Sequence, residues 1–322
     1  MGRRVFVTGI TGFAGSHLAE RLVASGAVVH GLAFEEPPYA NLAAVANDVR
    51  VHRGDITSVD DLRAALRDAR PEAVVHLAGQ AIPTQAAKDP VGAVKVNVLG
   101  TAALLTALDA APDASLVFAS SAEVYGSPER TPIDESAPLD PLNPYAATKV
   151  AAEALVKEAG DRERRPVVIL RPMNQIGPRQ HPDLVASAFA KQIAQAEAGG
   201  DRVVRHGSLD ARRDFLDVRD MADGYARASE IDSKGAEIFN VGTGHAVSIR
   251  EILTTLMGLA RVEVRAELDP ARTRSGTATT LALDATRFRE RTGWAPRTPL
   301  ETSLRDLLDY WRARSREGAR VS

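Results

Sequence analysis

Three glycines spaced three residues apart, directly after an apolar run, constrain the fold of this chain more than any other feature. Gly9, Gly12 and Gly15 follow the run RVFVT and precede a segment, 13–25, with helical spacing. In such a unit the first glycine permits a tight turn, the second lets backbone approach a pyrophosphate, and the third lets the helix pack closely. The pyrophosphate would meet the free N–H groups of that helix. The pattern predicts a dinucleotide-binding turn, and a purely structural turn is the alternative.

Apolar runs alternate with helical patterns through the first half of the chain. Further strands are predicted at 27–34, 49–56, 73–79, 115–121 and 166–172, and helices at 59–69, 90–111 and 144–160. Continuous apolar strands separated by helices indicate a parallel sheet that is covered on both faces. We therefore expect an α/β fold with a Rossmann-type, doubly wound parallel sheet. Gly160 is expected to end the last of these helices.

The second half of the chain is less regular and predicts a smaller C-terminal α/β lobe that binds substrate. Helical patterns lie at 183–200, 248–260 and 299–314, and strands lie within 212–231 and at 237–244. Ser248 is a good N-cap for the second of these helices. The predicted division is a dinucleotide-binding domain at 1–172 with 206–242 partly returning to it, a substrate-binding lobe at 173–205 and 243–314, and a flexible tail at 315–322.

Charge and composition exclude several classes of protein. The 40 basic and 42 acidic residues give a net charge of −2, which offers no electrostatic footprint for nucleic acid. The absence of cysteine excludes disulfides and thiolate metal ligands, and no metal site is expected. No apolar run is expected to span a membrane, and a strand pattern follows residues 2–4 at once. We expect a cytoplasmic protein with no membrane partner.

The residues after the second predicted strand bear on the choice of dinucleotide. A carboxylate there binds the ribose of NAD, and an arginine favours the 2′-phosphate of NADP. The chain has Ala33 and Phe34 and then Glu35 and Glu36, so neither discriminating residue stands at the expected place. We expect both NAD(H) and NADP(H) to bind. Asp55, after the third strand, is placed to accept from the adenine amino group, and a simple turn residue is the alternative.

A second constellation places a tyrosine and a lysine on one helix face. Asn143 is a good N-cap and Pro144 a good first helical residue, so Tyr145 lies in the first turn. Lys149 follows one turn later on the same face. A nearby ammonium lowers the pKa of a tyrosine, as proton transfer to or from a sugar hydroxyl or carbonyl requires. A chance Y-x-x-x-K match is the alternative interpretation.

The predicted strand at 115–121 ends in Ser121, within the motif SSAEVYG. Open α/β sheets place their ligands at the carboxyl ends of strands. Ser121 is therefore expected to donate a hydrogen bond to the same substrate oxygen that Tyr145 serves, which favours a catalytic role for the set.

These motifs resemble those of extended short-chain dehydrogenase/reductases that act on nucleotide sugars. The matching segments, in family order over nearly the whole chain, are VTGITGFAGSHL, GDI, VVHLAG, VNVLGT, SSAEVYG, PYAATK, RPMNQIGP, RRDFLDVRD and FNVGTG. Within this family SAFAKQIAQAEAG, SIREIL and GWAPRTPLETSLRDLLDYW are most similar to GDP-4-keto-6-deoxy-D-mannose reductases, whose relatives are the GDP-mannose 4,6-dehydratases.

The resemblance implies roles for residues at matching positions. The implied catalytic residues are Ser121, Tyr145 and Lys149. The implied cofactor-binding residues are Gly9, Gly12, Phe13, Ala14, Gly15, Ala33, Asp55, Ile56, Leu77, Ala78, Asn97, Tyr145, Lys149 and Pro172. The implied substrate-binding residues are Ser121, Asn174, Lys191, Arg213 and Arg274. Asn174 and Arg213 would reach the diphosphate. A solvated helix face is the alternative for Lys191, and an ion pair with Asp214 or Asp217 is the alternative for Arg213.

The chain departs from the family pattern at several positions. Met173 and Gln175 stand where the reductases have Phe and His, and Thr277 stands where the nucleotide-binding segment has Asp. Ala122 replaces the aspartate of an acid/base pair, although Glu123 remains. The acid/base pair of some dehydratases is therefore broken.

The expected reaction is the NAD(P)H-dependent reduction of an NDP-4-keto-6-deoxyhexose, above all GDP-4-keto-6-deoxy-D-mannose to GDP-D-rhamnose. The resemblance gives a slight preference for NADP(H) and implies a homodimer formed through 90–110 and 144–159. A 4,6-dehydratase with Glu123 as its base and a C4 epimerase are the alternatives. A regulator that binds NAD(P) without turnover is a third, which the intact Ser121, Tyr145 and Lys149 disfavour.

Overall fold

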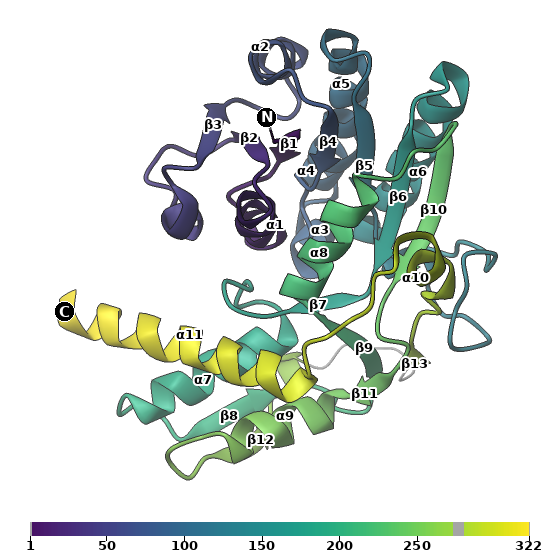
Figure 1. Cartoon of the computed structure of the whole chain (residues 1–322). Helices are drawn as coiled ribbons and strands as arrows, with labels where there is room; N and C mark the ends of the chain where they lie inside the picture. Colours follow the sequence, from purple (N-terminus) through teal and green to yellow (C-terminus); the bar gives the residue numbers. More distant parts are fainter. Residues whose placement is uncertain (1, 273–279, 322) are drawn as a thin grey trace.

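The computed structural model describes residues 2–272 and 280–321, and a large parallel sheet dominates it (Figure 1). Its strands are β1 (Arg4–Thr8), β2 (Val28–Ala33), β3 (Val49–Arg53), β4 (Ala73–His76), β5 (Ser115–Ala119), β6 (Val167–Pro172) and β10 (Ala236–Val241). Their spatial order is β3-β2-β1-β4-β5-β6-β10, and every neighbouring pair is parallel. The winding reverses between β1 and β4, where doubly wound sheets bind ligands.

Helices cover both faces of this sheet, as continuous apolar strands require. They are α1 (Phe13–Ala24), α2 (Val59–Ala69), α3 (Pro83–Lys88), α4 (Pro90–Val94), α5 (Gly100–Ala107), α6 (Pro144–Glu163) and α8 (Val218–Ala228). One apolar core joins the sheet to α1 and α8, and a second joins it to α2, α5 and α6.

The helix predicted at 90–111 is interrupted in the structure. A π-helical turn, Lys95–Leu99, separates α4 from α5. Asn97 is at the centre of this turn, and its amide side chain is held by hydrogen bonds outside the helix. Such bulges occur where a side chain is re-aimed, often at functional sites, and helical spacing in the sequence does not reveal them.

Two predicted helix ends were wrong. Gly160 does not end α6, which continues to Glu163 and is capped by Arg164 with a positive φ of 53°. A Cβ at Gly160 would lie 2.8 Å from Val167, so this glycine permits close helix–strand packing. The last helix, α11 (Leu300–Val321), passes the boundary predicted at 314. The added residues include arginine, glutamate and alanine, which are good helix formers.

The smaller lobe is built from short strands and three helices that share a third apolar core (Figure 1). Its strands are β7 (Asn174–Ile176), β8 (Val203–His206), β9 (Arg212–Asp217), β11 (Ala246–Ser248), β12 (Arg265–Leu268) and β13 (Thr280–Leu281). Its core helices are α7 (Val185–Glu197), α9 (Ile249–Gly258) and α11. A further helix, α10 (Thr286–Thr292), packs Phe288 into the core of the main sheet. The lobe follows directly on β6 through Met173.

One stretch, Pro90–Ala110, is long and apolar enough to cross a membrane by length and composition alone. The expectation that no stretch of this kind exists was therefore wrong. The buried helix of a sheet-covering layer meets the same criterion, so the finding is weak evidence for a span. In the structure Leu104 and Ala107 are buried in the core that joins this stretch to α2 and α6.

Candidate active site

The glycine turn joins β1 to α1 and requires glycine at two places. Gly9 has a positive φ of 69°, and a Cβ there would lie 2.9 Å from the backbone of Ala78. A Cβ at Gly15 would overlap the carbonyl oxygen of Gly9. Gly12 is the N-cap of α1 and supplies no side-chain cap, and the first turn contains no acidic residue. The N-terminus of α1 is therefore suited to an anionic group such as a pyrophosphate.

The end of β4 lies against this turn. The Leu77 N–H donates to the carbonyl oxygen of Thr8 over 3.2 Å, and the Ala78 N–H donates to the Thr8 hydroxyl over 3.2 Å. Phe13 and Ala14 open the helix on the other side of the turn. The structure thus brings together seven residue positions that the sequence assigned to the cofactor, from the glycine turn and from the end of β4.

Asn97 links the segment after β4 to α6. Its Oδ1 accepts from the Gln80 N–H over 2.8 Å, and its Nδ2 donates to the Thr148 hydroxyl over 2.9 Å. A Cβ at Gly79 would lie 3.0 Å from Asn97 Oδ1 and 3.6 Å from Lys149 Nζ. Gly79 therefore leaves the backbone after β4 open toward Asn97 and Lys149, on the path that a dinucleotide would take from the glycine turn.

Ser121 and Tyr145 meet through their hydroxyls. Ser121 follows β5, and its Oγ accepts from the Glu123 N–H over 3.2 Å. The Tyr145 hydroxyl forms a hydrogen bond with Ser121, and its ring packs against alanines of α3 and α4. Burial raises the pKa of Tyr145 to about 12, the Glu123 carboxylate adds to the increase, and the bond to Ser121 opposes it. The tyrosine is therefore protonated at neutral pH and is a weaker acid than a free tyrosine.

Lys149 lies on the same face of α6 but is directed elsewhere. Its Nζ donates to the carbonyl oxygen of Ala119 over 2.7 Å and lies 5.0 Å from the centre of the Phe118 ring. Burial lowers the pKa of Lys149 to about 8, and the Glu153 carboxylate opposes this. From the spacing of the two residues in the sequence, Lys149 was expected to lower the pKa of Tyr145. That expectation was wrong for this structure, in which desolvation of the tyrosine dominates.

Glu123 is tied to the start of the helix that carries Tyr145. Its Oε2 accepts from Asn143 Nδ2 over 2.9 Å, and Asn143 Oδ1 caps α6 by accepting from the Ala146 N–H over 2.9 Å. The carboxylate therefore has a positioning contact in addition to its proximity to the tyrosine.

The carboxyl ends of β2 and β3 carry an arginine that sequence reasoning missed. Arg53 pairs in register with Ala33, the last residue of β2. Its Nη1 lies 2.9 Å from Glu36 Oε1, and both side chains are more than 60% exposed, at 63% and 65%. Arg53 reaches the loop after β2 only because β2 and β3 pair in this register. Its position just before the GDI motif was the one available signal.

Asp55 and Ile56 hold the turn that precedes α2. Asp55 Oδ1 accepts from the N–H and the hydroxyl of Thr57, each over 2.8 Å. The bond from the Thr57 N–H lowers the pKa of Asp55. The turn interpretation of Asp55 therefore holds, and its second oxygen is not needed for the turn. Ile56 faces Gly100, where a Cβ would lie 3.1 Å from its side chain.

A buried network behind the catalytic residues was also missed. Glu153 accepts three hydrogen bonds from Arg171, the shortest being 2.6 Å, and one from Ser120. Arg171 Nη1 donates to the Tyr125 hydroxyl over 2.8 Å. Glu153 follows Lys149 by one helical turn, so the network fixes α6 against the ends of β5 and β6. A glutamate on an otherwise alanine-rich helix face was the signal.

The proposed substrate residues lie in or beside the lobe. Asn174 begins β7, which pairs with β9, the strand that carries Arg213; Asn174 itself is opposite Phe215. The Lys191 ammonium lies 5.4 Å from the centre of the Trp311 ring, a contact that belongs to the packing of α7 on α11. Arg274 lies outside the described residues.

Asp214 and Asp217, the two carboxylates that follow Arg213 closely in the sequence, hold neighbouring segments of the lobe. Asp214 accepts from the Thr243 hydroxyl and the Gly244 N–H, and Asp217 pairs with Arg219 over 2.8 Å. Pro172 ends β6 beside this region, two residues before Asn174. The register of β7 and β9 places Arg213 two residues before the partner of Asn174, beside the strand that follows the end of β6.

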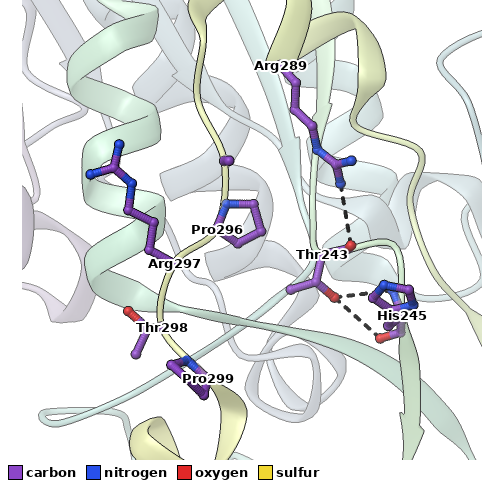
Figure 2. A pocket seen from close by; sticks show the side chains of 8 residues that line it. Thr243, His245, Arg289, Pro296, Arg297, Thr298 and Pro299 are labelled. Carbon is purple, nitrogen blue, oxygen red and sulfur yellow. Dashed lines mark hydrogen bonds between the residues drawn. The ribbon is translucent and has the colours of Figure 1, made fainter.

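A cavity of about 410 Å³ lies apart from all of these residues (Figure 2). Its lining comes from the loop after β10, from α10 and from the segment before α11: Thr243, His245, Arg289, Ala295, Pro296, Arg297, Thr298 and Pro299. Figure 2 shows Arg289 pointing toward Thr243, whose carbonyl oxygen accepts from Arg289 Nη2 over 3.4 Å. The cavity contains no member of the glycine turn or of the Ser121, Tyr145 and Lys149 set.

Comparison with known proteins decides the family. A family model described as GDP-mannose 4,6 dehydratase matches residues 6–307. The chain belongs to this family. It is 37% identical to the GDP-6-deoxy-D-mannose reductase of Pseudomonas aeruginosa over 98% of this chain and 100% of that protein. It is 34% identical to a UDP-glucose 4-epimerase of Mycolicibacterium smegmatis over 97% of this chain and 99% of that protein.

The solved structures agree. RMD from Pseudomonas aeruginosa, complexed with NADPH, matches with a TM-score of 0.84 and 33% identity over 97% of this chain and 100% of that chain. The expected extended short-chain dehydrogenase/reductase family, its Rossmann-type α/β fold and an NAD(P)(H) cofactor are thereby confirmed. The chain is an enzyme of a family that contains nucleotide-sugar reductases and epimerases.

Proposed function

We propose that this enzyme reduces a GDP-4-keto-6-deoxyhexose at C4, converting GDP-4-keto-6-deoxy-D-mannose to GDP-D-rhamnose. The observation that carries the proposal is the buried Tyr145 hydroxyl, which is hydrogen-bonded to Ser121 and carries a proton at neutral pH. A reductase needs a proton donor at this point, whereas a dehydratase or epimerase must first remove a proton from a C4 hydroxyl. The full-length similarity to a GDP-6-deoxy-D-mannose reductase supports the same reaction.

The residues divide the work as follows. The glycine turn and the backbone from Leu77 to Gly79 would hold a nicotinamide dinucleotide, which supplies the hydride that reaches C4. Ser121 donates a hydrogen bond to the C4 oxygen and orients it. Tyr145 gives its proton to that oxygen as negative charge develops there. The ammonium of Lys149, which lies 3.6 Å from the position of a Cβ at Gly79, would hold the dinucleotide beside Tyr145.

The test is stoichiometry. With a GDP-4-keto-6-deoxyhexose and NADPH, each turnover should consume one reduced cofactor. The loss of nicotinamide absorbance measures this consumption, and analysis of the sugar product measures turnover. The proposal fails if GDP-mannose with catalytic amounts of oxidised cofactor yields a 4-keto-6-deoxy product and Glu123→Gln abolishes that reaction.

For the cofactor we propose a modest preference for NADPH over NADH. Arg53 lies beside the end of β2, where the adenosine ribose is recognised in this fold, and its guanidinium suits a 2′-phosphate. Glu36 competes for the same guanidinium. Preference for NADPH above roughly a thousandfold, about 4 kcal/mol, would contradict this balance.

For the substrate we propose that Asn174 and Arg213 bind the diphosphate. A guanidinium on β9 and an amide on the neighbouring β7 approach the same side of the sheet. Arg274 is proposed as a further contact on the basis of the family resemblance alone.

For assembly we propose a cytoplasmic homodimer that uses α4, the π-helical turn and α6. These elements expose large apolar side chains: Val91 is 78% exposed, Leu99 is 57% exposed and Leu155 is 38% exposed. A second copy of this surface would cover them. Sedimentation of wild type and of Val91→Glu tests it, and a monomeric wild-type protein would contradict it.

A further inference from the structure

A second cluster of side chains with ligand chemistry lies at the outer edge of the main sheet. His30 comes from β2, His52 from the edge strand β3 and Asp68 from the last turn of α2 (Figure 1). One nitrogen of each imidazole and one carboxylate oxygen lie within 4.8 Å of one another. None of the three belongs to the glycine turn, the catalytic residues or the proposed substrate contacts.

The atoms of this cluster that could bind a metal ion lie close together. His30 Nδ1 lies 3.0 Å from His52 Nε2, and the same His52 nitrogen lies 3.7 Å from Asp68 Oδ2. A tetrahedral zinc ion with bonds of about 2.0–2.1 Å keeps neighbouring ligand atoms roughly 3.3 Å apart. The two observed separations bracket that value. Two imidazoles and one carboxylate also form a ligand set that zinc and related transition metals accept.

The surroundings leave the imidazoles in the form that binds metal. Burial lowers the pKa of His30 and of His52, so both rings are neutral at pH 7. The Phe6 ring lies 6.0 Å from His52 and forms an apolar wall beside it. The opposing charge is Arg50, whose Nη2 lies 2.9 Å from Asp68 Oδ2, but its side chain is 65% exposed and has room to leave.

We propose that His30, His52 and Asp68 form a binding site for one divalent transition-metal ion of the zinc type. Arg50 pairs with the Asp68 carboxylate in the absence of metal and is displaced when the ion binds. The bound ion would join the edge strand β3 to β2 and α2, so it would stabilise the fold without taking part in sugar chemistry. A hydrogen-bonded imidazole pair beside a surface ion pair is the competing explanation.

The test is titration of the full-length protein with Zn²⁺ by calorimetry, and with Co²⁺ by visible absorption, which is intense for tetrahedral cobalt. Wild type should bind one ion per chain. His52→Ala and the more exposed Asp68→Asn should each weaken binding by at least about tenfold, since both remove a ligand. His245→Ala is the matched control, because His245 is exposed and lies outside the cluster.

Arg50→Gln separates the metal site from a structural role. Removing this neighbouring positive charge should tighten Zn²⁺ binding by about tenfold, because two like charges no longer compete for Asp68. A merely structural cluster would gain no metal affinity from this change. Equal Zn²⁺ affinity in wild type and His52→Ala, no binding at all, or unchanged affinity in Arg50→Gln would each overturn the proposal.

Discussion

The catalytic region and the substrate lobe are built in different ways. In the catalytic region the functional atoms belong to backbone or to buried side chains, with Tyr145 only 7% exposed and Lys149 only 6% exposed. In the lobe the functional candidates include polar side chains on short strands, one of which, β7, has only three residues. The first region is fixed by packing on both faces of a large sheet, and the second depends on individual side chains.

We infer from this difference that the catalytic region determines the type of reaction and that the lobe determines which substrate is bound. Hydride and proton transfer require atoms held within fractions of an ångström, which a close-packed core provides. Recognition of a nucleotide and a sugar depends on a few charged and polar groups that loops and short strands present. Substitutions in the first region should therefore change kcat, and substitutions in the second should change KM.

The largest expected effect comes from the catalytic tyrosine. Tyr145→Phe should lower kcat by a factor on the order of 10² to 10⁴, because it removes the proton donor. Binding of NADPH, followed by its fluorescence, should survive because the glycine turn is unchanged. Tyr310→Phe, on α11, is the matched control and should be active. A folded Tyr145→Phe enzyme with near-normal turnover would remove the tyrosine from the mechanism.

Substitutions in the substrate lobe should change KM and leave kcat nearly unchanged. Arg213→Ala should raise KM for the nucleotide sugar by about 10- to 100-fold, since it removes charge-assisted hydrogen bonds to the diphosphate, and should change kcat little. Arg212→Ala tests the neighbouring position on the same strand, where Arg212 pairs with Glu251 over 3.3 Å. A loss confined to kcat in Arg213→Ala would erase the proposed division between the two regions.

The pH profile tests which group limits proton donation. Tyr145 stays protonated because its pKa is raised to about 12, while the pKa of Lys149 is lowered to about 8. As pH rises through about 8, Lys149 loses the charge with which it would hold the dinucleotide beside Tyr145. kcat/KM for reduction should therefore be flat below this pH and fall above it, by up to about tenfold per unit. A profile that rises across the same range would indicate a base and favour the epimerase or dehydratase alternatives.

Much of the catalytic region could be predicted from the sequence, because its signals are local. The spacing of Gly9, Gly12 and Gly15 identifies a turn whose tight contacts the structure contains. Asn143 and Pro144 identify the first turn of α6, and Asn143 does cap that helix. In these cases neighbouring residues along the chain determine the geometry.

The missed features depend on contacts between distant segments. Arg53 reaches the cofactor end of β2 only through the register of two parallel strands. The direction of Lys149 is set by the Ala119 carbonyl group, which lies 30 positions earlier in the chain. The π-helical turn at Asn97 follows from hydrogen bonds to Gln80 and Thr148. Helical periodicity contains no information about any of these contacts.

A smaller effect is expected at the cofactor end of the sheet. Arg53→Ala should weaken NADPH binding by about tenfold or less, because an exposed guanidinium is partly screened, and should leave NADH binding unchanged. Glu36→Gln should shift the same ratio toward NADPH. Titration of both cofactors measures each effect, with Arg50→Ala as a control on the same strand. Equal losses for NADPH and NADH in Arg53→Ala would show that Arg53 does not bind the 2′-phosphate.

The smallest expected effect separates the two chemistries most sharply. Glu123 accepts a hydrogen bond from Asn143, and Gln at this position can still accept it through its amide oxygen. In a reductase no step requires a carboxylate there, so Glu123→Gln should lower kcat by less than about tenfold. Removing the negative charge also removes one cause of the raised pKa of Tyr145, so the tyrosine becomes a slightly better proton donor. In a dehydratase the same substitution removes the base that takes the C5 proton, and turnover would be lost. Glu123→Asp, which keeps the charge but shortens the reach to Asn143, distinguishes a positional loss from a chemical one.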